Sequence, residues 1–186
     1  YLASPPAIGG TAAAAGTFTS LTATTTVTTP SIAHSGTSGT GDIGASGAAF
    51  GTVWATATSA KYADLAEIYK SDKQYEPSTV VVFGGTEEIT VTKKTHDTRV
   101  AGVISTDPAY LMNSEADGLP VAFTGRVPCK VRGPVSKGDV LVTSAYEGYA
   151  EQMTDALYKP GCILGKALGD VAENEFATIE VVVGRF

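Results

Sequence analysis

Apolar and polar residues alternate over short distances in the last two thirds of the chain, and this pattern predicts an all-β domain. Eight runs are continuously apolar or alternate with a period of two, and turns rich in Gly, Pro and Asp separate them. The runs cover residues 79–83, 88–92, 99–105, 120–131, 139–144, 149–154, 162–168 and 176–183. Many short strands at this spacing are typical of a β-sandwich or a small barrel.

One segment has a helical period. In "KYADLAEIY" (61–69), the residues Tyr62, Leu65, Ala66 and Tyr69 fall at i, i+3, i+4 and i+7. This spacing places them on one face of a helix, so the pattern favours a short helix here.

A sequence pattern occurs twice in the β-rich region. "PSTVVVFGG" leads, after one more strand, to "VAGVIS", and "PVSKGDVLV" leads likewise to "ILGKAL". In both copies the second strand carries a central glycine, Gly102 or Gly165. A glycine inside a strand usually marks a bulge, a barrel corner or a close backbone approach. We therefore expect a pseudo-duplicated β-unit.

The first third of the chain is poor in large apolar residues. Residues 1–60 are mostly Ala, Gly, Ser and Thr, and "GTFTSLTAT" (16–24) returns imperfectly as "GTVWATAT" (51–58). The large apolar residues include Phe18, Leu21, Val27, Ile32, Ile43, Phe50, Val53 and Trp54. One chain cannot bury enough of them to offset backbone ordering of about 1–2 kcal/mol per residue. Gly has no strict period of three and no heptads occur, which excludes collagen and coiled coil.

We therefore expect an intertwined, trimeric fibrous β shaft over residues 1–60. A globular β-sandwich or small-barrel module should follow directly over residues 61–186. Three copies of the Thr/Ala/Gly-rich segment packed around a common axis would bury the sparse apolar side chains that one chain leaves exposed.

Charge is distributed as unevenly as hydrophobicity. All thirteen Lys and Arg residues lie from Lys61 onward, and Asp42 is the one charged residue before it. The formal net charge is −6, and no Lys/Arg cluster could neutralise phosphates, which argues against a nucleic-acid partner. No signal peptide or membrane span is visible, and the start at Tyr1 suggests a piece of a longer polypeptide. Cys129 and Cys162 both lie in apolar runs, where two buried thiols are expected.

Candidate chemistry is sparse. His34 lies in a Gly/Ser loop; three copies on a trimer axis could hold a metal, but a solvated loop histidine is the simpler interpretation. His96, in the charged turn "KKTHDTR", is also expected to be solvated. The sequence has no HExxH, CxxC or Walker pattern. We therefore expect no catalytic, cofactor-binding or metal site.

Two further groups of residues each allow more than one interpretation. Asp64 and Glu67 would share a helical face, either solvated or in ion pairs with Lys61 and Lys70. A second group consists of the tyrosines of an acidic loop region. Tyr146, Tyr149 and Tyr158 could form a sugar-stacking patch, although core packing or trimer contacts would explain them as well.

The segments "PPAIGGTAAAAGTFTSLTAT" and "FGTVWATATSAKYADLAEIY" resemble the shaft repeats and junction of trimeric tail fibres of tailed bacteriophages. "YEPSTVVVFGG", "RVAGVISTDPAYLMN", "GLPVAFTGRVPCKVRGPVSKGDVLVTS" and "PGCILGKAL" resemble the globular module that follows such a junction. Together these stretches cover nearly the whole chain. The run from 62 to 168 is more specific than the low-complexity shaft repeat.

The module is similar, more distantly, to the self-cleaving, peptidase G2-like intramolecular chaperone domain of phage neck appendages. That resemblance implies trimerisation, and in the relatives it implies a cut between Ser and Asp just before a Tyr-Ala-Glu sequence. Alignment on Tyr-Ala places Ala60 and Lys61 at the scissile pair and Asp64 at the Glu. Because the Ser hydroxyl and the Asp carboxylate of the pair are both missing, the sequence predicts no autoproteolysis.

The expected function is structural: the distal part of a homotrimeric phage tail fibre, assembled in the host cytoplasm and carried on the virion. The module would register the three chains. Its expected partners are the rest of the fibre and virion, with a host surface glycan or protein as a further candidate. A receptor-binding tip is the first alternative, and an autoproteolytic chaperone is the second.

Overall fold

The computed structural model describes residues 20–37, 43–44, 47–48, 50–53 and 63–184. The chain divides into two units, residues 1–54 and 55–186. The boundary expected at residues 60–61 lies outside the described residues, as do residues 16–19 and 54–58 of the two repeat copies at 16–24 and 51–58. The two units are described separately below.

In the first unit, every described residue is exposed. Apart from a single bridge residue, Ala48, none of its described residues belongs to a β-strand. The large apolar side chains are among the most exposed, with Ile32 at 82% and Ile43 at 83%. A single chain therefore provides no core for the described part of this segment.

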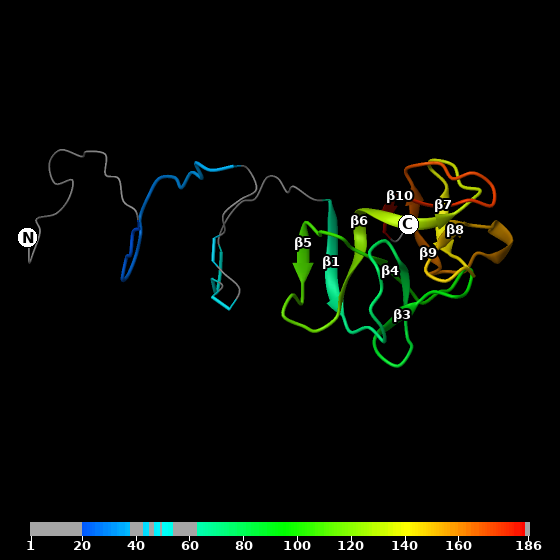
Figure 1. Cartoon of the computed structure of the whole chain (residues 1–186), viewed down its shortest axis with the longest axis horizontal. Helices are drawn as coiled ribbons and strands as arrows, with labels where there is room; N and C mark the ends of the chain where they lie inside the picture. Colours follow the sequence, from blue (N-terminus) through cyan, green and yellow to red (C-terminus); the bar gives the residue numbers. More distant parts are fainter. Residues whose placement is uncertain (1–19, 38–42, 45–46, 49, 54–62, 185–186) are drawn as a thin grey trace, which may run out of the picture. The chain divides into compact units, whose positions relative to one another are not determined.

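The described part of the second unit is a ten-stranded β-structure with one short 3₁₀ helix (Figure 1). The first five strands are β1 (Asp64–Tyr69), β2 (Val80–Phe83), β3 (Ile89–Val91), β4 (Val100–Ile104) and β5 (Tyr110–Met112). The remaining elements are β6 (Leu119–Arg132), β7 (Val140–Thr143), β8 (Ala150–Gln152), η1 (Asp155–Leu157), β9 (Ile163–Ala167) and β10 (Phe176–Val183). All eight strands predicted from the sequence are confirmed, and the all-β class with them.

The C-terminal half of this unit is a closed small barrel. Strand β6 pairs with β10, β10 with β9, β9 with β7, β7 with β8, and β8 returns to β6 through Val131 and Ala150. Of the two expected architectures, a sandwich or a small barrel, the structure therefore contains the barrel. Its interior is filled by small and medium apolar side chains. They include Val127, Cys129, Val131, Leu141, Leu164, Ala167 and Val181.

The N-terminal half repeats the same arrangement. Strand β1 pairs with β6, β6 with β4, β4 with β2, and β2 with β3. A parallel bridge between Ser71, just after β1, and Ile89 of β3 completes this second ring. Because β6 is 14 residues long, its first part belongs to the N-terminal ring and its last part to the C-terminal ring.

Gly102 and Gly165, the central glycines of the repeated sequence pattern, occupy equivalent positions in the two rings. Gly102 pairs with Val81 and Gly165 with Leu141, and the strand register shifts beside each pair. A Cβ at either glycine would lie 2.1 Å from a carbonyl oxygen, that of Ala122 or that of Val182. The prediction of mid-strand bulges with close backbone approach is thus confirmed.

The backbone contacts around the two bulges also correspond. The amide of Ile104 donates to Thr79 O (2.9 Å), as the amide of Ala167 donates to Asp139 O (3.0 Å). This agreement of register and hydrogen bonds supports the predicted duplication of a β-unit.

The helix expected over residues 61–69 is wrong. From Asp64 to Tyr69 the chain is strand β1, with side chains alternately buried and half-buried. Residues 64, 66 and 68 are buried, and residues 65, 67 and 69 are half-buried. On the second face, Tyr69 packs against the core cluster that contains Leu119 and Val121. The period-two alternation was hidden in the sequence because a charged residue, Asp64, occupies one of the buried positions.

Both cysteines are free and fully buried, as predicted from their apolar surroundings. Burial raises the pKa of the Cys129 thiol because the thiolate would lose its hydration. Neither sulfur is therefore placed for chemistry at the surface.

Candidate functional site

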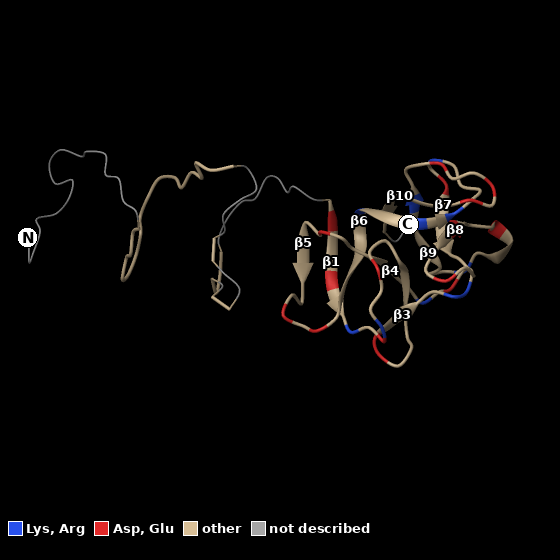
Figure 2. Ribbon diagram, viewed as in Figure 1, with Lys and Arg blue, Asp and Glu red and all other residues tan. Residues whose placement is uncertain are grey.

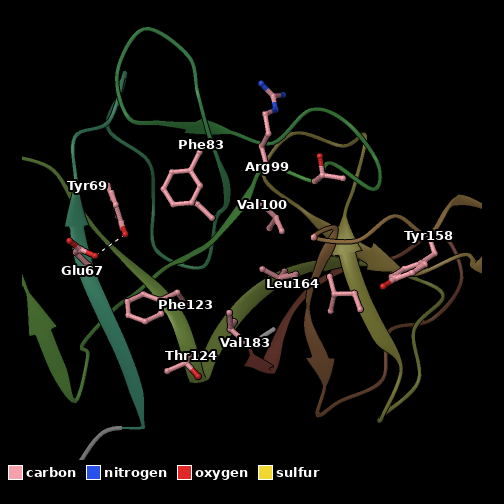
Figure 3. Close-up of a pocket in the computed structure, with 15 residues that line it drawn as sticks. Glu67, Tyr69, Phe83, Arg99, Val100, Phe123, Thr124, Tyr158, Leu164 and Val183 are labelled. Atoms are coloured by element: carbon pink, nitrogen blue, oxygen red, sulfur yellow. Dashed lines mark hydrogen bonds between the residues drawn. The ribbon is translucent and has the colours of Figure 1, made fainter. Parts of the chain in front are cut away.

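The principal candidate site of the second unit is a groove of about 810 Å³ lined by residues of both rings (Figure 3). From the N-terminal ring come residues of β1, β2, β4 and β6. From the C-terminal ring come residues of β9, the end of β10 and the segment before β9. The lining residues are Glu67, Tyr69, Phe83, Thr98, Arg99, Val100, Ala101, Phe123, Thr124, Tyr158, Gly161, Ile163, Leu164, Val183 and Gly184.

Aromatic side chains dominate one side of the groove. Tyr69 and Phe83 meet edge to face with ring centroids 5.4 Å apart, and Phe83 is 39% exposed. Figure 3 shows Phe123 near this pair and Tyr158, which is 50% exposed, on the opposite side. These rings form flat apolar surfaces that a ligand or another protein chain could cover.

A β-bulge accounts for the position of Phe123. Leu65 of β1 pairs with Thr124, and the next residue, Ala66, pairs with Ala122. Phe123 is left as the extra residue of β6, and a bulge of this kind redirects a side chain relative to the regular alternation. The sequence carries no clear sign of it, because "VAFTG" reads as an ordinary strand.

The polar side-chain groups of the groove are one carboxylate, one guanidinium, two threonine hydroxyls and two tyrosine hydroxyls. The hydroxyl of Tyr69 donates to Oε2 of Glu67 at 2.8 Å, which joins two side chains on the same face of β1. Arg99 donates from Nε and Nη2 to the two oxygens of Asp97, at 3.1 and 2.7 Å. The Arg99 guanidinium lowers the pKa of the Asp97 carboxyl, whose side chain is only 4% exposed.

The pH dependence of folding should report the Asp97–Arg99 pair. Because the pKa of Asp97 is lower in the folded state, its ionised form stabilises the fold above the unfolded value of about 3.9. This contribution should disappear as the pH falls through the lowered folded value. We expect the Asp97→Asn variant to lose less stability than the wild type between about pH 5 and pH 2. Urea unfolding at a series of pH values measures this, and parallel curves would contradict the prediction.

Asp64 and Glu67 do not share a face. The side chain of Asp64 is buried and its Oδ2 accepts a hydrogen bond from the Ser105 hydroxyl at 2.6 Å, whereas Glu67 faces the groove. The expected shared face assumed a helix and is therefore wrong. Lys70 forms an ion pair with Glu87, with its Nζ 3.1 Å from Oε2. Lys61 and the aligned pair Ala60–Lys61 lie outside the described residues.

His96 is not a solvated loop histidine as expected. It is 5% exposed, with a positive φ of 51°, and both ring nitrogens have hydrogen-bond partners in the protein. Its partner Thr154 lies 58 residues away, so the local charged sequence gave no sign of the burial. His34 lies among the exposed residues of the first unit.

The three tyrosines of the predicted patch do not all line one site. Tyr146 and Tyr149 both pack edge to face against Phe176, with centroid distances of 5.1 and 5.0 Å. The guanidinium carbon of Arg132 lies 4.7 Å from the centre of the Tyr146 ring. Tyr158 lines the groove instead, where the sequence had not placed Phe83 or Phe123.

Neither a scan against known protein families nor a search of curated proteins found a match to this chain. Within the described residues, no group of three or more His, Cys, Asp or Glu side chains is arranged to hold a metal ion. No helix in the described part of the chain has the length and hydrophobicity needed to cross a membrane.

Proposed function

We propose that this chain is the distal part of a homotrimeric tail fibre of a tailed bacteriophage, a structural component of the virion. The observation that carries the proposal is the exposure of the first unit. Its described large apolar side chains, those of Leu21, Val27, Ile32, Ile43, Phe50 and Val53, are between 55% and 83% exposed. The sequence resemblance to phage fibre shafts and to the module that follows them supports the same function.

Partner chains would remove this exposure at little cost. Burying one Val, Leu, Ile or Phe side chain contributes about 1.5–3 kcal/mol, and three chains around one axis would bury each position three times. Figure 2 shows no Lys, Arg, Asp or Glu on the described residues before β1, so no charge would have to be desolvated there. The segment has the properties of one strand of a shared core.

The second unit supplies what such a shaft needs in order to assemble. Contacts between three extended chains are non-local and therefore form slowly. The described strands of the second unit form two hydrogen-bonded rings with apolar cores of their own. Association of three such modules would bring the shaft segments together in register and raise their effective concentration.

Native mass spectrometry or light scattering of the chain tests the proposal. The expected species has three times the 19.0 kDa mass of one chain. The shaft should resist proteolysis in this species, since its backbone is then packed. A monomer at micromolar concentration, with residues 1–60 rapidly digested, would overturn it.

The groove favours a second role, the recognition of a host surface glycan. Sugar rings stack on aromatic faces and form hydrogen bonds with carboxylates and hydroxyls. Phe83, Tyr158, Glu67 and Thr124 provide both kinds of group around one cavity. A glycan array with the wild type and the Phe83→Ala variant tests this role, with Phe176→Ala as an exposed aromatic control outside the groove. Binding that persists in Phe83→Ala and is lost in Phe176→Ala would place the site at the cluster of Tyr146, Tyr149 and Phe176 instead.

A further inference from the structure

A buried histidine ties an exposed segment to the C-terminal ring. The backbone amide of Thr154 donates to Nε2 of His96 at 3.1 Å. The His96 Nδ1 lies 2.7 Å from the Thr95 hydroxyl, which donates in turn to Oε1 of Glu151. The loop that carries His96 is itself fixed to β7, because the His96 amide donates to Thr143 O and the Asp97 amide to Thr143 Oγ1.

These contacts define one protonation state of the ring. An amide N–H can only donate, so Nε2 of His96 must be the acceptor and carry no proton. The neutral ring therefore has its proton on Nδ1, from which it donates to the Thr95 hydroxyl. The Thr95 proton is then directed to Glu151, in agreement with its contact there. The hydrogen bonds that link Thr154, His96, Thr95 and Glu151 can all form together only while His96 is neutral.

The segment that follows Thr154 has little else to hold it. Residues 154–161 are all exposed, and the short helix η1 within them buries no side chain. The segment is anchored at one end by the amide of Met153, which donates to Val140 O, and at the other by the buried Cys162. Its residues Tyr158 and Gly161 line the groove. The contact between Thr154 and His96 therefore restrains one wall of the groove.

We propose that His96 is a pH-sensitive latch whose protonation releases Thr154 and loosens the groove wall formed by residues 154–161. A second proton on the ring must be placed at Nε2. The protonated nitrogen can no longer accept from the Thr154 amide, and two N–H groups then face each other. The latch concerns the mobility of this wall, whatever the groove binds.

Charged groups of several elements surround His96. The Glu151 carboxylate is joined to Nδ1 of the ring through the Thr95 hydroxyl. Nη1 of Arg132 lies 4.0 Å from Oε2 of the same Glu151 carboxylate. On the loop of His96 itself, the Asp97 carboxylate is neutralised by Arg99, and Lys93 pairs with Glu147 at 3.6 Å. Two other charged residues lie nearby in sequence. Lys94 is two residues before His96, and Asp155 follows Thr154 in the segment 154–161.

Nuclear magnetic resonance of the full chain can follow both ends of the latch. The imidazole nitrogen shifts report the tautomer and charge of His96, and solvent exchange of the Thr154 amide reports the hydrogen bond. At about pH 7.5 we expect the Nδ1–H tautomer and a protected Thr154 amide. When the pH is lowered and His96 gains its proton, Thr154 exchange, corrected for the intrinsic pH effect, should rise by about tenfold or more. The Tyr158 ring signals should change with the same midpoint.

Two variants serve as controls. In His96→Gln the side-chain amide oxygen can accept from Thr154 but cannot titrate, so the acid-induced exchange should be absent. In His34→Gln, at the exposed histidine of the first unit, it should be unchanged. The proposal is overturned if His96 is in the Nε2–H tautomer, if it gains its proton while Thr154 stays protected, or if it stays neutral in the folded chain down to about pH 4. Because the wild-type titration decides each of these outcomes, the test stands even if His96→Gln fails to fold.

Discussion

Gly102→Ala should destabilise the second unit by about 3 kcal/mol or more. The added Cβ would lie 2.1 Å from the carbonyl oxygen of Ala122 on the neighbouring strand β6. Backbone cannot move aside as a flexible side chain can, so β4 and β6 would have to separate where they pair. The φ of 157° at Gly102 adds backbone strain for an alanine.

Gly169→Ala is the matched control. Its Cβ would meet only Ile179 side-chain atoms at 3.5 Å, an ordinary contact, and its φ lies outside the positive range. We expect a change within about 1 kcal/mol, favourable if the reduced freedom of the unfolded chain dominates. Urea unfolding followed by circular dichroism measures both variants. Equal midpoints for Gly102→Ala and wild type would mean that the close approach of β4 to β6 is absent in solution.

Leu141→Ala should cost about 2–5 kcal/mol by leaving a cavity in the closed barrel. Leu141 is fully buried and lies on β7 between Gln152 of β8 and Gly165 of β9. Because its neighbours belong to a closed ring, they cannot collapse easily into the space that the side chain leaves. The loss should therefore fall in the upper part of this range.

Leu157→Ala removes the same atoms from an exposed position. Leu157 is 50% exposed on η1, so its truncation should change stability by no more than about 0.5 kcal/mol. Thermal unfolding of the two variants in parallel separates the cavity effect from the intrinsic change of side chain. Similar melting temperatures for both variants would contradict a packed barrel interior.

The strands could be predicted from the sequence because local patterning determines them. The run at residues 120–131 corresponds to β6 even though it contains Pro128, and the central glycines of two other runs mark the bulges at Gly102 and Gly165. Each of these features is visible within about ten residues of sequence. Strand β5 (Tyr110–Met112) was not predicted.

The candidate site could not be predicted in the same way, because its residues acquire their roles from distant partners. The local sequence predicts a solvated Asp64 and a solvated His96, whereas in the fold their hydrogen-bond partners are the distant residues Ser105 and Thr154. Phe123 faces the groove because of a bulge whose cause lies in the pairing of β1 with β6. The shaft expected over residues 1–60 is intermolecular, and it remains a prediction.

The sharing of β6 between the two rings has a consequence for how the second unit can fail. Both rings use part of this strand, since β1 pairs with residues 119–125 and β10 with residues 125–132, so loss of β6 would open both rings. We therefore expect the duplicated units to unfold together. A partly unfolded module with one intact ring would be a rare species, and few unpaired strand edges would be exposed to neighbouring chains during assembly.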